Sequence, residues 1–324
     1  MNDNYQDKMM KKLIKKDFNK LGLTILMNSL IANVVIIICV IIITMMRLIT
    51  NPNMTNDNTM KILEDGTYSG TMSIVAVIIA FIPFLIYRGR KFFQYDLRVE
   101  NKKFTVKTVA VAIIILLSLN SLLVMFSNVL EVALNAIGFS ANFALEELET
   151  LNQLTIPMIA YSCIIAPIFE EFIYRGAVLR SLEKYGKRFA ILISATLFGL
   201  MHGNFYQIFM AIGVGIILGY LATEYSIKLT ILLHIINNVC VQVLSQITIN
   251  LGGKIENIID IAFTCISIIV LIIVFIRKRN YTKEWLQNNK VQKGLMLKFF
   301  TSILIILVVT FDIFEVISGI TKIQ

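Results

Sequence analysis

Charged side chains are scarce in this sequence of 324 residues. Only 16% of the residues are Asp, Glu, Lys or Arg, whereas 57% are hydrophobic, and the mean hydropathy is +0.76. In soluble domains the mean hydropathy is much lower, and about a quarter of the residues are charged. No long polar segment remains that could form a soluble domain. The composition therefore excludes a soluble globular protein and favours one embedded in lipid.

Cysteine is also rare, and its placement excludes two further classes. The four cysteines, Cys39, Cys163, Cys240 and Cys265, all lie in apolar runs and show no CxxC spacing. A secreted disulfide framework or a thiolate metal site would need paired or regularly spaced cysteines. We interpret these residues as small packing side chains.

Long apolar runs are abundant. They recur from Leu23 to the C-terminus, and about 20 apolar residues are enough to cross a bilayer as a helix. The first run is too long for a cleaved signal peptide, and no small-residue cleavage pattern follows it. The sequence thus predicts an all-α, polytopic integral membrane helix bundle of about eight to nine transmembrane helices. The expected spans are roughly 22–46, 73–88, 108–130, 154–183, 188–203, 205–222, 227–249, 257–276 and 297–318.

The basic residues predict the orientation in the membrane. Lys and Arg gather in alternate loops, whereas the loops between carry Asn (51–70) or Glu (146–149). Because cytoplasmic loops carry the excess of Lys and Arg, the N-terminus is expected in the cytoplasm and the protein in the cell membrane. The segment 9–18 either lies on the anionic leaflet as an amphipathic helix or forms a solvated tail. The net charge of +9 is thus explained by topology, and no nucleic acid partner is expected.

The fourth apolar run contains an unusual group of ionisable residues. Glu171 and Arg175 are one helical turn apart and can form an ion pair, whereas Glu170 points about 100° away. An unpaired carboxyl group in an apolar setting is suited to act as a general base. Pro167 lacks an N–H and leaves a carbonyl free one turn earlier, which predicts a kink or polar opening beside Glu170. The alternative is a packing ion-pair cluster, or a segment at the headgroup level.

The only two histidines of the chain lie in the fifth and seventh runs. His202 shares a helix face with Phe198, and His234 shares one with Asn238. At 1.5 Å per residue, Glu170 lies about 21 Å before Lys184 and His202 about 22 Å after Lys187, so the two lie at depths that allow them to meet. His234 lies only about 9 Å beyond Lys228 and matches that depth only if its helix starts deeper or tilts.

These residues resemble three motifs of a known family: type II CAAX prenyl endopeptidases and bacteriocin-processing proteins, the CPBP or Abi family. Its EExxxR, FxxxH and HxxxN motifs appear in order as Glu170-Glu171 with Arg175, Phe198 with His202, and His234 with Asn238. The resemblance covers roughly residues 105–250. It implies a catalytic membrane core over 105–250, preceded by a basic segment with two peripheral helices in 1–104 and followed by peripheral helices in 251–324.

The resemblance also implies an intramembrane endopeptidase mechanism. Glu170 would be the general base, with His202 orienting the water. His234 and Asn238 would stabilise the oxyanion, and Glu171, Arg175 and Phe198 would support the site. Both Asn and His can donate hydrogen bonds to an oxyanion shielded from solvent. No cofactor is expected; the alternative is a zinc ion held by Glu170, His202 and His234, although no HExxH motif is present.

Membrane lipid and a membrane-associated peptide or protein substrate are the expected partners. The heavy use of Ile, Lys and Asn suggests an AT-rich bacterial genome, which favours peptide maturation or bacteriocin self-immunity over cleavage of a prenylated protein. The alternative function is a non-catalytic bacteriocin-immunity or scaffold protein. A transporter with a proton relay is a third class, but the inverted repeat typical of transporters is not seen.

Overall fold

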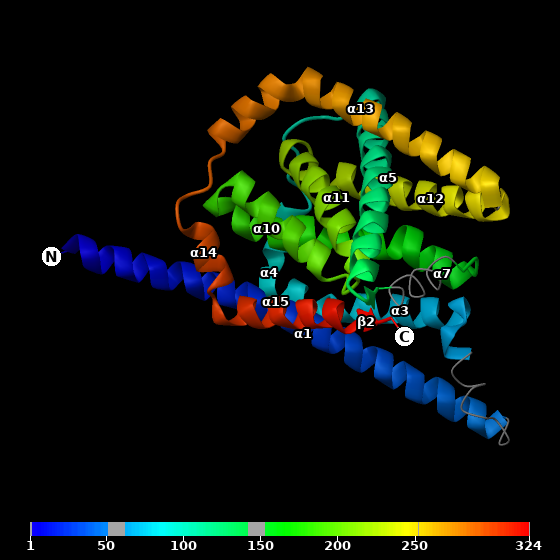
Figure 1. The fold of residues 1–324 in the computed structure, drawn as a ribbon. Coiled ribbons are helices and arrows are strands. Elements are labelled where there is room, and N and C mark those ends of the chain that lie inside the picture. The colour runs from blue at the N-terminus through cyan, green and yellow to red at the C-terminus, as the bar shows by residue number, and fades with distance from the viewer. Residues whose placement is uncertain (1, 51–61, 142–152, 252, 324) are drawn as a thin grey trace.

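The chain folds almost entirely into helices, as expected for a polytopic membrane protein (Figure 1). A computed structural model describes residues 2–50, 62–141, 153–251 and 253–323. The acidic loop 146–149 and most of the Asn-rich loop lie outside these ranges. In chain order the elements are α1 (Asn2–Thr50), α3 (Gly66–Ala80), α4 (Ile82–Arg88), η1 (Phe92–Asp96), α5 (Val106–Ala136), β1 (Phe139–Ser140), α7 (Ile156–Ala160), η2 (Tyr161–Ile165), α8 (Ala166–Glu171), η3 (Phe172–Leu179), α9 (Arg180–Leu182), η4 (Glu183–Tyr185), α10 (Lys187–Leu200), α11 (Phe205–Glu224), α12 (Ile227–Leu251), α13 (Gly253–Asn288), α14 (Leu295–Phe300), α15 (Ile303–Ser318) and β2 (Thr321–Lys322).

Seven helical segments in the described residues are long and apolar enough to cross a membrane. The expected spans at 188–203 and 297–318 are not among them. Helix α10 has 14 residues, or about 21 Å, against a hydrocarbon thickness of about 30 Å. The last run breaks between α14 and α15, which leaves 16 residues in its longer helix. Helix α10 is apolar because most of its side chains are buried inside the protein, which hydropathy alone does not distinguish from facing lipid.

Helix α10 lies at the centre of the bundle and packs closely on α11. A Cβ atom built on Gly215 would lie 3.1 Å from Ala195, and one on Gly219 would lie 3.2 Å from Ile191. The small-residue stripe of α11 (Ala211, Gly215, Gly219) therefore allows close helix packing, as small residues do between membrane helices.

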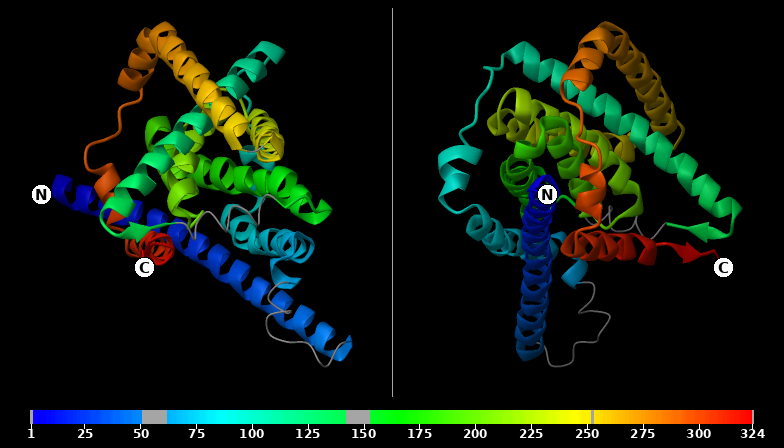
Figure 2. Two further views of the ribbon diagram at one scale, coloured as in Figure 1. Left: turned by 45° about the vertical axis from the view of Figure 1, so that its right-hand side comes forward. Right: turned by 90° about the vertical axis from the view of Figure 1, so that its left-hand side faces the viewer.

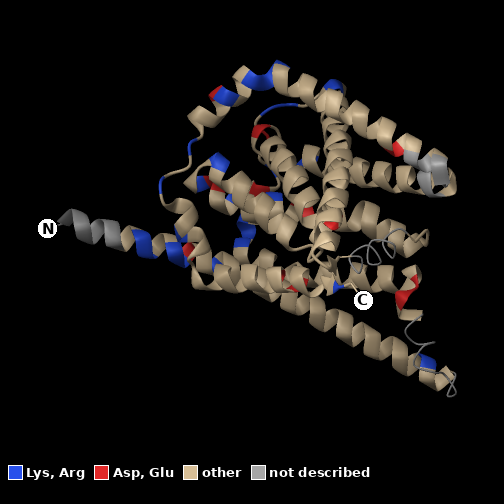
Figure 3. Cartoon of the chain, in the orientation of Figure 1, with Lys and Arg blue, Asp and Glu red and all other residues tan. Residues whose placement is uncertain are grey.

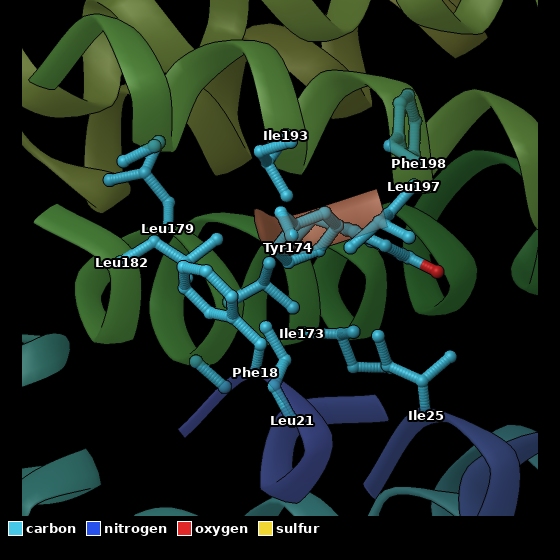
Figure 4. Close-up of a cluster of buried hydrophobic side chains, with 14 of the residues drawn as sticks. Phe18, Leu21, Ile25, Ile173, Tyr174, Leu179, Leu182, Ile193, Leu197 and Phe198 are labelled. Carbon is cyan, nitrogen blue, oxygen red and sulfur yellow. The ribbon is translucent and has the colours of Figure 1, made fainter. Parts of the chain in front are cut away.

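The largest apolar core joins α1 to the centre of the chain (Figure 4). Phe18, Leu21 and Ile25 of α1 pack against Ile173 and other side chains of η3 and against α10. The ring of Phe18 also lies 5.1 Å from that of Phe299 in α14. Thus α1 and the C-terminal helices cover one side of the central helices.

The other side of the central helices is covered by α5 and α13, which contact each other (Figure 2). The short strands β1 and β2 pair in antiparallel register, Phe139 with Lys322. Lys and Arg concentrate toward the left of Figure 3, around the N-terminal part of α1, the start of α10 and the end of α13. The long helices between carry few charges, as the sequence predicts.

Candidate active site

The helix that carries Glu170 is not a regular α-helix. It runs from α7 to α9 and contains two π-helical stretches, η2 and η3, on either side of α8. Such widened turns are frequent at functional sites. In η2 the N–H of Ala166 bonds to the carbonyl of Tyr161, five residues back. In the same pattern the partner of Ser162 would be Pro167, which has no N–H.

The carbonyl of Ser162 is instead satisfied from another helix. The Asn238 side-chain amide of α12 donates to it at 3.0 Å. The polar opening predicted beside Glu170 is therefore present, and Asn238 fills it. An amide nitrogen has two N–H groups, so this bond leaves one for another acceptor.

Glu171 and Arg175 form the ion pair that their spacing predicts. The distance from Arg175 Nη1 to Glu171 Oε1 is 2.9 Å, and both side chains are completely buried. The guanidinium group also stacks on the ring of Phe198, 4.3 Å from its centroid. Since a lone buried charge is costly, each member of the pair keeps the other in place.

His234 contacts Glu171 of this pair and also its neighbour Glu170. Its Nδ1 lies 3.0 Å from Glu171 Oε1, and its Nε2 lies 3.6 Å from Glu170 Oε2. An ionised carboxylate can only accept, so Nδ1 carries a proton and donates it to Glu171. The other ring nitrogen then faces Glu170. At 3.6 Å this contact is longer than a hydrogen bond, so the two groups are neighbours without being hydrogen-bonded to each other.

The structure thus brings Glu170 together with His234, the histidine whose depth matched only if its helix started deeper or tilted. Glu170 retains 16% exposure of its side chain, whereas His234 retains 5%. The carboxylate is therefore the member of the pair that a reactant can reach. Within the described residues, His202 forms no ion pair with Glu170.

His202 lies in the turn that follows α10 and contacts the ring of Phe198, as His234 also does. Its Nδ1 lies 2.8 Å from the Phe198 carbonyl, which can only accept, so Nδ1 is the protonated nitrogen. In a neutral ring Nε2 then keeps its lone pair. The Phe198 ring contacts both His202 and His234, with centroids 5.1 and 5.8 Å apart. Phe198 is therefore a shared packing partner of both histidines and of Arg175.

Three polar residues near the site were missed by the sequence-based prediction. Asn120 of α5 donates to the Asn237 side chain at 2.9 Å, and both residues are buried. Glu315 of α15 packs against Gly203, where a Cβ atom would lie 3.1 Å from Glu315 Oε2. Asp312, one turn earlier, is 7% exposed. All three are polar residues inside apolar runs, which was the signal that identified Glu170.

The set proposed for zinc is not assembled as a ligand cluster. Within the residues that the structure describes, no group of three or more His, Cys, Asp or Glu side chains could hold a metal ion. Glu170 and His234 are close, whereas the ring of His202 contacts the Phe198 carbonyl through Nδ1.

The family comparison covers the same part of the chain. The family described as type II CAAX prenyl endopeptidase Rce1-like matches residues 152–240. This range includes all three motifs and thus Glu170, Glu171, Arg175, His234 and Asn238. We refer to this segment, which is similar to that family, as the Rce1-like segment. The resemblance inferred from the motifs is thus confirmed, and the Rce1-like segment supports an intramembrane protease kind of function for a multi-pass membrane protein. No curated protein and no solved structure matches the chain.

Proposed function

We propose that the Rce1-like segment hydrolyses a peptide bond in a membrane-associated peptide or protein, with Glu170 as the general base. The observation that supports this most is the array in which Arg175 and His234 hold Glu171 while Glu170 stays partly exposed. One carboxylate is fixed and neutralised, and its neighbour remains available for proton transfer. Two adjacent glutamates thus take different roles through their surroundings.

In the proposed reaction, Glu170 removes a proton from water as the water oxygen bonds to the carbonyl carbon. The carbonyl oxygen becomes an oxyanion, which His234 and the second N–H of Asn238 stabilise. The proton then passes through Glu170 and His234 to the leaving nitrogen as the C–N bond breaks. His202 would orient the water through the lone pair of Nε2. These steps need no metal ion or other cofactor.

We further propose that the substrate is a bacterial peptide or protein without a prenyl group, processed in peptide maturation or bacteriocin self-immunity. The protein would lie in the cell membrane with its N-terminus in the cytoplasm. The grouping of Lys and Arg toward one end of the molecule supports this orientation. The nonprenylated substrate rests on the amino-acid usage of the chain.

The test is hydrolysis of quenched-fluorescence peptides by the purified chain in liposomes, with matched farnesylated and unmodified peptide sets. Glu170→Gln should lower the turnover about 100-fold or more, because it removes the general base but keeps the side-chain volume. Glu284→Gln, an exposed carboxylate on α13, is the matched control and should leave turnover unchanged. Undiminished hydrolysis by Glu170→Gln would refute the assignment.

The same variants separate the protease from the non-catalytic alternative. Cells that express the chain are challenged with a bacteriocin, and survival is compared between wild type, Glu170→Gln and His202→Gln. If both variants protect as well as wild type and no peptide is cleaved, the chain acts as an immunity or scaffold protein.

A further inference from the structure

A polar cleft with a volume of about 330 Å³ lies outside the candidate active site, where α1 meets the end of the helix that bears Glu170. Five Lys or Arg side chains and one Asp line it. Lys20 comes from α1, Arg90 and Lys91 follow α4, and Lys184 lies at the end of the Glu170 helix. The cleft therefore joins three segments that are far apart in the sequence.

Two of the five basic groups already have acidic partners. Lys184 Nζ lies 2.5 Å from Asp17, and Arg88 makes two bonds of 2.6 Å with the buried carboxylate of Asp96. Burial raises the pKa of Asp96, and its pairing with Arg88 opposes that rise. These pairs fix the walls of the cleft without adding net charge.

The other three basic groups give the cleft its charge. Lys20, Arg90 and Lys91 form no ion pair with any described residue. When Asp17 and Asp96 are counted against the five basic groups, the cleft has a net charge of +3. The ammonium group of Lys20 lies 5.7 Å from the centroid of the Tyr87 ring, which also lines the cleft. Such a group of donors, from separate helices, matches the oxygens of a phosphate.

The apolar surface beside the cleft favours a lipid over a free anion. Lys20, Leu23 and Met27 lie on one face of α1, three and seven residues apart. Leu23 is 50% exposed and Met27 39% exposed, and Leu30 continues the apolar surface. A headgroup held at Lys20 would thus place its acyl chains along an exposed apolar stripe of the same helix.

We propose that this cleft binds the phosphate of an anionic membrane lipid and thereby holds α1 against the end of the Glu170 helix. Basic clefts between membrane helices on the cytoplasmic side are suited to anionic headgroups. The inference does not depend on the proposed peptidase activity, since it uses none of the site residues.

The test is native mass spectrometry of the full chain with phosphatidylglycerol or phosphatidylcholine in the detergent. The wild type should retain phosphatidylglycerol preferentially. Arg90→Gln/Lys91→Gln should weaken that retention about 10- to 30-fold, as expected when two basic groups lose contact with an anionic headgroup. Lys103→Gln/Lys107→Gln removes the same charge from an exposed loop and helix start and should leave retention near that of wild type.

A second arm separates the possible sources of phosphate and guards against a misfolded variant. The single variant Lys20→Gln should weaken retention several-fold, and the thermal unfolding of every variant is measured alongside. Equal loss in both double variants would show that general surface charge, not the cleft, holds the lipid. Displacement of phosphatidylglycerol by millimolar inorganic phosphate, with no preference between the two lipids, would overturn the lipid assignment in favour of a free anion.

Discussion

The Rce1-like segment and the terminal helices α1 and α13 differ in what their side chains contact. The most apolar stretch of α1 contains no buried residues, and that of α13 almost none, whereas 44% of the corresponding stretch of α11 is buried. Both regions are apolar enough to cross a membrane, although the stretches in α1 and α13 are the more apolar. The polar side chains distinguish them, because the buried ion pair and the two histidines are all in the central segment. Compared with α1 and α13, the central segment is thus distinguished by its buried ionisable residues and not by its apolar ones.

The largest expected effect comes from breaking the buried ion pair of the central segment. Glu171→Gln leaves the Arg175 guanidinium buried without its charge partner, which should lower the free energy of unfolding by about 3–5 kcal/mol. Unfolding in mixed micelles measures this change. Replacing both residues by apolar ones (Glu171→Leu/Arg175→Met) should restore part of the loss, because no lone charge then remains.

The matched pair at the terminal helix gives the contrast. Asp17 and Lys184 are 45% and 59% exposed in their side chains, so Asp17→Asn should cost about 1 kcal/mol or less. If Asp17→Asn destabilises the protein as much as Glu171→Gln does, burial is not what separates the two regions.

A smaller effect is expected from the close contact between α10 and α11. A Cβ atom on Gly199 would lie 2.3 Å from Ile212 Cγ1 and 2.8 Å from the Ile208 carbonyl oxygen. Gly199→Ala should therefore destabilise the protein by about 1–3 kcal/mol, as overpacking does. Gly319→Ala is the control, because its Cβ would approach only the Val316 carbonyl, at 3.6 Å. Thermal unfolding in detergent compares the two variants. Equal midpoints would show that α10 and α11 can move apart to accommodate the added methyl group at no cost in stability.

The smallest effect tests how far the central segment depends on its neighbours. Asn120→Leu removes the hydrogen bond from α5 to Asn237 and should cost about 0.5–1 kcal/mol, typical of a bond between membrane helices. Ser127→Ala, on the same helix but bonded only to its own Leu123 carbonyl, is the matched control. A loss in Ser127→Ala equal to that in Asn120→Leu would mean that α5 is sensitive to any substitution and that this bond has no special role.

Much of the fold and part of the site could be predicted from the sequence. The apolar runs gave most of the helices, and the spacing of Glu171 and Arg175 gave their pair. The span count was higher because α10 is apolar for a different reason: its neighbours, not lipid, surround it. Length would have been the better criterion, since 14 residues are too few to cross the bilayer.

The partner of Glu170 could not be predicted in the same way. Counting from Lys228 assumes a straight helix that starts at the membrane surface, whereas His234 reaches Glu170 through the packing of α12 against α8. Asp312 and Glu315 were missed for another reason. They lie far along the chain, outside the motifs, and only the fold brings α15 to the turn after His202.

The π-helical stretch η2 changes which residues share a face along the Glu170 helix. A π turn accommodates about one residue more than an α turn, and one residue corresponds to about 100° of rotation. The face that α7 presents therefore does not continue along α8, and no single 3.6-residue stripe describes both. Deleting one residue from Tyr161–Ile165 would turn Ile156 and its neighbours around the axis relative to Glu170. The extra residue thus rotates α7 relative to α8 about the helix axis. One continuous helix can therefore face lipid at its beginning and present Glu170 and Glu171 to the candidate site at its centre.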